Sequence, residues 1–308
     1  MHCVRLARHA MATRFEFVLL GEDQVRLRAA GEEALAEIQA LEKRLSFYSQ
    51  TSELSQINRR AAREPVRVAS DVFELLQTAL RLSQATDGAF DPTVAPLMRC
   101  WGFVRSTGRF PDERELSDAR RVTGMNLVHL DEENSTIRFT RPGVELDLGG
   151  IAKGYALDEA AAHLRSAGIE HALLHGGTST IVAMGRSFDE SRWRVGIVRK
   201  DASILGTVEL SDCTMSVSAV TGKAFVRDGM VYGHVIDPRT GKPAKGASLA
   251  AVVAESATVS DALSTAALLL GFEAHIISDL CTGWGIDIVQ SQSEAFIQER
   301  LPGFRAVT

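Results

Sequence analysis

The stretch ELDLGGIAKGYALD, from Glu145 to Asp158, places two adjacent glycines between a short apolar run and the start of a helical pattern. A P-loop needs the spacing G-x-x-x-x-G-K-[ST], and a dinucleotide-binding turn needs G-x-G-x-x-G. Here the spacing is G-G-x-x-x-G, with Lys153 before the last glycine, so the stretch fits neither pattern. A helix N-terminus behind paired glycines still favours an anion. A tight turn with a positive φ at one glycine is the simpler explanation of the pair.

The segments around this motif alternate irregularly between helix and strand patterns. The spacing of apolar residues predicts helices over residues 22–46, 70–88, 156–167 and 262–272. In the second of these, Ser70 is the expected N-cap and Gly88 the end. Strands and hairpins are predicted over residues 13–21, 127–140, 170–175, 179–185, 193–198, 207–211, 214–220 and 225–236. Residues 47–58 have turn character, and residues 89–103 are predicted to be a loop with two prolines. This irregular order favours a mixed α+β fold over a doubly wound sheet.

The composition is that of an ordinary globular chain. It has 308 residues, of which 45% are hydrophobic and 24% charged, and its formal net charge is -5. That length suits one large domain or two small ones that share a cleft. An acidic balance without a basic cluster argues against nucleic-acid binding. The four cysteines lie far apart without a Cys-x-x-Cys pair, so the sequence suggests neither a zinc site nor a disulfide framework.

The N-terminal segment MHCVRLARHAMATRFEFVLLG is basic but lacks the continuous apolar core of a signal peptide. No apolar stretch precedes Cys3, so a lipoprotein anchor is not expected. No segment is long and apolar enough to span a bilayer. We therefore expect the protein to be cytoplasmic.

A second candidate site lies in VSDALSTAALLLG, residues 259–271, where Asp261 and Thr265 are four apart and share one helical face. A carboxylate and a hydroxyl oxygen suit a hard cation such as Mg²⁺, which takes few carboxylates and completes its shell with water and substrate phosphate. Helix capping is the simpler explanation: Ser260 would cap the helix, and Asp261 would complement its dipole in the first turn.

Two further segments carry weaker signals. In GHVIDPRTGKP, residues 233–243, His234 ends a predicted strand beside a turn, where a histidine could act as a general base. A structural histidine is the simpler explanation. In TDGAFDPTVAPL, residues 86–97, Phe90 and Asp91 stand in a loop that should be exposed and could grip a heterocycle. A loop anchored in the core through Phe90 explains the pair equally well.

Each motif alone is weak, but their order is specific. The chain contains, in sequence, MATRFEF, FYSQTSELSQIN, TDGAFDPTVAPL followed by WGF, DLGGIAKGYALD, HGG, GHVIDPRTGKP and SDALSTAALLLG. This series resembles the FAD:protein FMN transferases, known as the ApbE family, over about residues 11–272. The resemblance implies a single domain across residues 1–308, with mixed sheets and helices forming two lobes around a central flavin cleft.

The chemistry that this resemblance implies is that of a Mg²⁺-dependent enzyme. Such a transferase cleaves the diphosphate of its substrate FAD and releases AMP. It transfers FMN to a threonine or serine hydroxyl of an acceptor protein with a flavinylation motif. By similarity, the backbone carbonyl of Ala152 and the side chains of Asp261 and Thr265 hold the cation, with Ser264 as a further candidate ligand. His234 matches the histidine thought to deprotonate the acceptor hydroxyl.

Family positions around the flavin are matched by a larger set of residues, namely Met11, Tyr48, Ala89, Phe90, Asp91, Gly149, Lys153, Tyr155 and Val235. The chain also departs from the family pattern. His175 stands where Asn usually precedes a glycine pair, and Thr178 where an acidic residue or Asn often follows it. Thr221 stands where Ser is common, and Ala12 where Gly is frequent. None of these changes removes a predicted metal ligand or the base, so we expect activity with altered flavin contacts or acceptor preference.

Other functions stay open at this point. With water as the acceptor, the same site would be an FAD pyrophosphatase that releases FMN and AMP. With turnover lost, the chain would be a flavin-binding accessory protein, although the joint presence of Asp261, Thr265 and His234 speaks against this. An oxidoreductase is the least supported alternative, because nothing in the chain suggests a second redox substrate.

Overall fold

The computed structural model describes residues 1–105, 108–199, 202–220, 223–245 and 247–271, and beyond them residues 276, 279–280, 286–292, 295–299 and 305–306. Its centre is an antiparallel sheet of eight strands, in the order β1-β2-β6-β7-β10-β15-β16-β17. These strands are β1 His2–Ala10, β2 Thr13–Gly21, β6 His171–Gly176, β7 Thr180–Met184, β10 Cys213–Ala219, β15 Leu249–Ala254, β16 Asp287–Gln292 and β17 Ala295–Glu299. The predicted mixed α+β architecture is confirmed.

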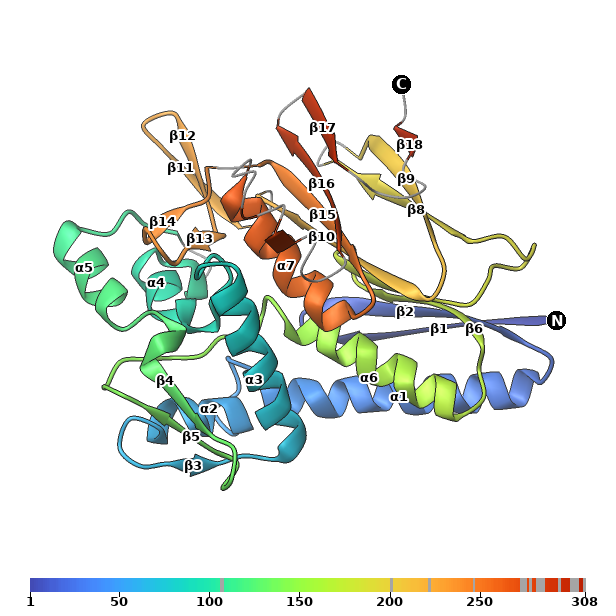
Figure 1. The fold of residues 1–308 in the computed structure, drawn as a ribbon, viewed down its shortest axis with the longest axis horizontal. Coiled ribbons are helices and arrows are strands. Elements are labelled where there is room, and N and C mark those ends of the chain that lie inside the picture. Colours follow the sequence, from blue (N-terminus) through green and yellow to red (C-terminus); the bar gives the residue numbers. More distant parts are fainter. Residues whose placement is uncertain are drawn as a thin grey trace.

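Both faces of this sheet are covered, because successive side chains of a strand point to opposite sides. On β7, Val182 and Met184 join the large core under the helices, while Ile181 and Ala183 join a second core on the other face. Three helices cover the first face (Figure 1): α1 Gln24–Leu45, α6 Ala152–Ser166 and α7 Ala257–Leu270. A smaller sheet packs on the second face: β8 Trp193–Val198, β9 Ile204–Leu210 and, at its edge, β18 Arg305–Ala306.

A second lobe of short helices and hairpins lies at the left of Figure 1, beside the helical layer. Its helices are α2 Glu53–Arg60, α3 Ser70–Ala85, α4 Ala95–Cys100 and α5 Glu113–Arg121, with 3₁₀ turns at Pro92–Val94, Phe103–Arg105 and Met125–Leu127. One three-stranded sheet is formed by β3 Val66–Arg67, β5 Thr136–Phe139 and β4 Val128–Asp131. Two hairpins follow later in the chain: β11 Ala224–Arg227 with β12 Met230–Gly233, and β13 Ile236–Asp237 with β14 Lys242–Pro243. A small aromatic core around Trp101 and Phe103 joins α4 to the first of these hairpins.

Two segments that the sequence predicts as irregular contain helices. The prediction of turn structure over residues 47–58 is wrong in its second half, because Ser52 caps α2 by accepting a hydrogen bond from the Ser55 N–H. The predicted loop over residues 89–103 contains a 3₁₀ turn and α4, each with a proline in its first turn. Proline is tolerated there because the first N–H groups of a helix have no intrahelical partner, so it marks a helix start here.

Several predicted boundaries shift. Ser70 is the first residue of α3 and not its cap, since the N-cap position is Ala69, and the helix ends at Ala85 before Gly88. Helix α6 begins at Ala152, directly behind the glycine pair, and not only at residue 156. The hairpins predicted over residues 127–140 and 225–236 are confirmed, and so is the burial of the apolar helix α7. In the part of the chain that the structure describes, no helix combines the length and the apolar composition that crossing a membrane requires.

Candidate active site

The glycine pair forms a turn that uses ordinary backbone angles. Positive φ angles occur at other described glycines but not at Gly149 or Gly150, so the alternative of a left-handed turn does not hold. Instead, the Asp147 carboxylate accepts a hydrogen bond from the Gly149 N–H at 2.8 Å and closes the turn. A Cβ added at Gly150 would lie 3.4 Å from the ring of Phe90 and 3.8 Å from the hydroxyl of Thr265. The turn therefore places the backbone of Gly150 next to Phe90 and Thr265, two predicted site residues.

Behind this turn, α6 crosses α7 at very close range. A Cβ at Gly154 would collide with the carbonyl oxygen of Ala257, so only glycine lets the two backbones approach this closely. Asp158, one turn further along α6, then caps α7. Its carboxylate accepts hydrogen bonds from the Ala257 and Thr258 N–H groups, both at 2.8 Å, and from the hydroxyls of Ser256 and Thr258, both at 2.7 Å. The motif that fails as a phosphate loop thus fixes the start of α7.

Asp261 lies where the two helices cross. Helix α7 is capped by Ser256 and not by Ser260, so Asp261 stands in the second turn and the dipole explanation does not hold. Asp261 is only 4% exposed. The Gly154 N–H donates to its carboxylate at 3.1 Å, the Thr180 hydroxyl donates at 3.3 Å, and the Lys153 ammonium lies 3.5 Å away. A buried carboxylate with so few strong donors keeps capacity for a cation.

A ladder of hydroxyl groups holds the next turn of α7 against β10. Thr214, Ser216 and Ser218 alternate along β10 and share one face, which points at α7. The Ser218 hydroxyl lies 2.8 Å from that of Ser264 and 3.3 Å from that of Thr265. The sequence prediction missed Ser218, although the alternating hydroxyls of TMSVSAV were visible as a signal. The ladder fixes Thr265 on the same side of α7 as Asp261.

A cavity of about 1870 Å³ opens between the sheet, the glycine turn and the second lobe. Its wall brings together most of the predicted site residues, namely Tyr48, Ala89, Phe90, Asp91, Gly149, Lys153, His234, Val235, Asp261 and Thr265. These residues come from distant parts of the sequence. Their convergence on one hollow is what a binding site for a ligand as large as a dinucleotide requires.

Four other predicted site residues do not line this cavity, although the structure describes them all. Met11 lies in the β1–β2 turn with a φ of 50°, and its N–H donates to the Glu42 carboxylate at 2.7 Å. Ala152 is the buried first residue of α6, and Ser264 is fully buried behind Thr265. Tyr155 packs against the main core, where burial raises the pKa of its phenol. Their roles toward a ligand stay predictions.

The aromatic and acidic residues after α3 are less exposed than predicted. Phe90 is 5% exposed, so the expectation of an exposed loop is wrong and its ring anchors the loop in the core. Asp91 is also buried, which raises its pKa, and it accepts hydrogen bonds from the Thr93 and Met125 N–H groups. Tyr48, by contrast, is 67% exposed at the cavity wall.

His234 directly follows β12 and reaches the cavity from the second lobe. Its backbone N–H donates to the carbonyl of Lys223 at 2.9 Å, and its ring lies edge-on to Phe103 with centroids 6.4 Å apart. Within the described residues, its Nδ1 is buried without a hydrogen-bond partner. Burial lowers the pKa of His234. The imidazole is therefore neutral at neutral pH, the form that can accept a proton.

Residues that the sequence marked as departures also reach the cavity. His175 and Thr178 both line it, and burial lowers the pKa of His175. Thr221 lies outside the described residues. The sequence prediction missed Asp147 and Lys223, which line the cavity as well. Burial raises the pKa of Asp147, while the two neighbouring lysines, Lys153 and Lys223, oppose this rise.

The donor set near Asp261 fits a hard divalent cation better than a soft one. The oxygen groups that line the cavity there are the Asp261 carboxylate and the Thr265 hydroxyl, and within the described residues no group of three or more His, Cys, Asp or Glu side chains gathers. One carboxylate with neutral oxygens leaves several coordination positions to water or phosphate, as Mg²⁺ prefers. Zinc would call for more nitrogen or sulfur ligands than these.

A cavity in an α+β fold that brings together a buried carboxylate, a lysine and a neutral histidine is typical of an enzyme that binds a sizeable ligand. Comparison with known proteins names the class. The model of the ApbE family matches residues 11–279, and the chain belongs to this family.

The chain is 32% identical to the FAD:protein FMN transferase of Vibrio cholerae over 243 residues, which are 77% of this chain and 72% of that one. It is 32% identical to the FAD:protein FMN transferase of Treponema pallidum over 266 residues, covering 80% and 73% of the two chains. Among solved structures, it resembles the ApbE protein of Thermotoga maritima with a TM-score of 0.89 at 29% identity, over 97% of each chain.

Proposed function

We propose that this protein is a Mg²⁺-dependent flavin transferase that cleaves the diphosphate of FAD and attaches FMN to a threonine or serine hydroxyl of an acceptor protein. The observation that carries this proposal is the convergence on one cavity of Asp261 and Thr265, from helix α7, and of His234, which follows strand β12. The names of its relatives in Vibrio cholerae and Treponema pallidum support the same activity.

The residues of the cavity have separable tasks in this reaction. Asp261, Thr265 and the carbonyl of Ala152 would hold the cation, which when bound would offset the negative charge of the diphosphate. Lys153, 3.5 Å from Asp261, adds a positive charge beside the same phosphates. His234 accepts the proton of the acceptor hydroxyl while the hydroxyl oxygen bonds to the FMN phosphorus. The bond from that phosphorus to the AMP oxygen breaks, and AMP leaves with the electron pair.

Hydrolysis of FAD is the second candidate function, because water could take the place of the acceptor hydroxyl without any change of residue. It predicts release of free FMN and AMP. A flavin-binding protein without turnover is the third candidate. A neutral imidazole whose Nδ1 has no hydrogen-bond partner among the described residues favours proton transfer over binding alone.

One assay separates the three. The purified chain is mixed with FAD and Mg²⁺, with and without an acceptor protein that the Vibrio cholerae relative flavinylates, and both AMP and the mass of the acceptor are measured. The expected result is AMP together with an acceptor heavier by one FMN. Free FMN with unmodified acceptor would replace the proposal with hydrolysis. Bound, unchanged FAD across several divalent metals would replace it with flavin binding.

A further inference from the structure

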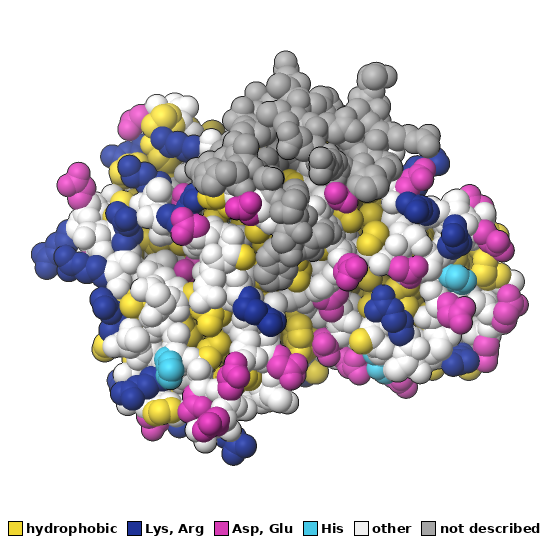
Figure 2. Space-filling model, viewed as in Figure 1, with side chains coloured by type: hydrophobic (Ala, Val, Ile, Leu, Met, Phe, Trp, Pro, Cys, Tyr) yellow, Lys and Arg dark blue, Asp and Glu magenta, His cyan; other side chains and the backbone are white. Residues whose placement is uncertain are grey.

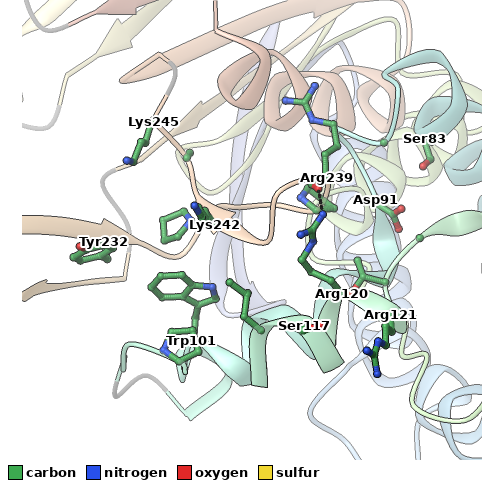
Figure 3. A pocket seen from close by; sticks show the side chains of 18 of the residues that line it. Ser83, Asp91, Trp101, Ser117, Arg120, Arg121, Tyr232, Arg239, Lys242 and Lys245 are labelled. Carbon is green, nitrogen blue, oxygen red and sulfur yellow. Dashed lines mark hydrogen bonds between the residues drawn. The ribbon is translucent and has the colours of Figure 1, made fainter. Parts of the chain in front are cut away.

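A second hollow, of about 1310 Å³, lies between helix α5, hairpin β11–β12 and the β13–β14 turn (Figure 3). Its wall includes the rings of Trp101 and Tyr232 and the cationic side chains of Arg120, Lys242 and Lys245, and we call it the basic groove. No step of the flavin chemistry uses it. We propose that the basic groove and the adjoining hairpin bind the acceptor protein, as an extended segment that carries acidic side chains. This inference rests on the proposed function.

The basic groove and the flavin cavity are neighbours. Asp91 and Pro238 line both, so the two hollows meet at these residues. Strand β12 lines the groove with Met230 and Tyr232 and runs directly into His234, which lines the cavity. A polypeptide that presents its hydroxyl to His234 therefore has β12 and the β13–β14 turn as its immediate surroundings. A water molecule would need no such surface.

The cations of the groove are available to a partner. In the described part of the chain, no carboxylate lies within ion-pair distance of Arg120, Lys242 or Lys245, and all three side chains are exposed. The Arg120 guanidinium donates one hydrogen bond, to the carbonyl of Arg239 at 3.1 Å. Such groups attract an acidic partner and set its orientation more than its affinity.

The acidic residues of the groove are partly occupied. Asp91 is buried and accepts hydrogen bonds from backbone N–H groups. Asp112 caps α5 in a capping box with Glu115. The other two acids of the wall are Asp87 and Glu113. The available charges therefore leave a positive balance, which complements an acidic segment.

The hairpin beside the groove exposes an apolar surface. Val226, Met230 and Val231 are 68%, 54% and 71% exposed, and Figure 2 shows hydrophobic and basic side chains together over β11–β12 at the upper left. Tyr232 on β12 stacks on Phe225 on β11 with ring centroids 5.3 Å apart, so aromatic packing holds the two strands of the hairpin together. Among the described strands, β11 and β12 pair only with each other. Their open edges can accept an extended segment as an added strand.

Binding and transfer are measured separately in the test. The probe is a fluorescently labelled acceptor protein that the Vibrio cholerae relative flavinylates, titrated against the full chain by anisotropy. The groove variant is Lys242→Glu/Lys245→Glu, and its matched control is Arg63→Glu/Arg67→Glu, two exposed cations that line neither hollow. We expect the groove variant to weaken acceptor binding at least about tenfold and the control to leave it unchanged. FAD binding should be equal in both variants.

Two further measurements sharpen the outcome. Raising the salt concentration should weaken binding by the wild type more than by the groove variant, because screening acts on the same charges. Val226→Asp/Val231→Asp, on the hairpin, should also weaken acceptor binding, whereas Val25→Asp, an equally exposed valine on α1, should not. Equal acceptor affinity of the wild type, the groove variant and the hairpin variant Val226→Asp/Val231→Asp would overturn the inference.

The outcomes distinguish this inference from the proposed function. A wild-type chain that binds the acceptor through the groove but transfers no FMN would refute the function and keep the docking surface. If the wild type transfers FMN, and the groove and hairpin variants do so with the same KM for the acceptor as the wild type, the docking surface is refuted and the function is kept. A dimer in sedimentation that the groove variant dissociates would show that a second copy of the chain, and not the acceptor, occupies the groove.

Discussion

The two halves of the active site are built differently. The half around Asp261 is buried, and the helix crossing, the Asp158 cap and the hydroxyl ladder on β10 hold it in place. The half around His234 stands between an exposed hairpin and a turn, and among the described residues a backbone hydrogen bond to Lys223 and the ring of Phe103 position it.

This difference matches what each half has to bind. In the proposed reaction, a cation and a diphosphate would be the same in every turnover, so a rigid set of oxygen atoms would serve them best. The proposed acceptor is a protein that would arrive and leave in every turnover, so the proposed base belongs on a surface that a partner can reach. The contrast predicts that damage near Asp261 abolishes the chemistry, while damage near His234 separates chemistry from binding.

The largest effect is expected from Asp261. Asp261→Asn keeps the shape of the side chain but removes its charge, so it should lower kcat at least about a hundredfold, because it weakens the cation that stabilises the diphosphate. AMP release at saturating Mg²⁺ measures this effect. Thr180→Val, which removes only the 3.3 Å hydrogen bond to this carboxylate, is the matched control and should retain most activity. Full turnover by Asp261→Asn would refute the metal assignment.

His234→Ala should come next. Loss of a general base typically costs about a hundredfold or more in rate, so kcat for FMN transfer should fall by that order. Titration of FAD by flavin fluorescence should give nearly the wild-type Kd, because the imidazole lies beside the acceptor path. A large rise in the Kd for FAD instead would identify His234 as a flavin contact. The two halves of the site would then not differ in the way described above.

A substitution of Asp158 tests whether the half of the site around Asp261 depends on the capping of helix α7 by the Asp158 carboxylate. Asp158→Asn keeps the size but weakens the hydrogen bonds to the start of α7, and we expect it to destabilise the fold by about 2 kcal/mol. Thermal unfolding measures the loss, and kcat should fall with it because Asp261 shifts with α7. Glu159→Gln, the next and exposed position of α6, should change neither quantity. An unaltered Tm for Asp158→Asn would show that the helix crossing at Gly154 suffices.

Much of the fold follows from local patterns in the sequence. The helices α1, α6 and α7 and the hairpins were predictable because their periodicity and turn residues lie within one segment. The pairing of β2 with β6 was not, since residues 15–20 meet residues 171–176 across about half the chain. Nor was the start of α2, where one serine turns a polar stretch into a helix.

The site shows the same division. Ordered motifs identified Asp261, Thr265 and His234, and the structure brings these residues to one cavity. Ser218 and Asp158 escaped notice because their roles depend on partners in other elements, such as Thr265 and Ala257. Sequence spacing states which side chains share a helical face. It does not state which strand that face meets.

The smallest predicted effect concerns pH, and it probes the environment of His234. Burial is the main cause that lowers its pKa from the ordinary value near 6.5. A hydrogen bond with the backbone of Lys223 raises this pKa, and the positive charge of the Lys223 side chain lowers it. The base must be neutral, so kcat falls only as pH drops through this lowered pKa. Between pH 8 and pH 6 the loss should stay below about fourfold, which is the loss that an unperturbed histidine would give.

The pH profile of kcat under saturating FAD and acceptor measures this effect. Lys223→Gln removes the nearby charge and should move the acidic limb toward higher pH, because a protonated imidazole is then less disfavoured. Arg63→Gln, at an exposed cation that lines neither hollow, is the control and should leave the limb in place. If kcat of the wild type falls to half its maximum at pH 6.5 or above, the imidazole is solvated during turnover. The half of the site around His234 would then be open even when the acceptor is bound.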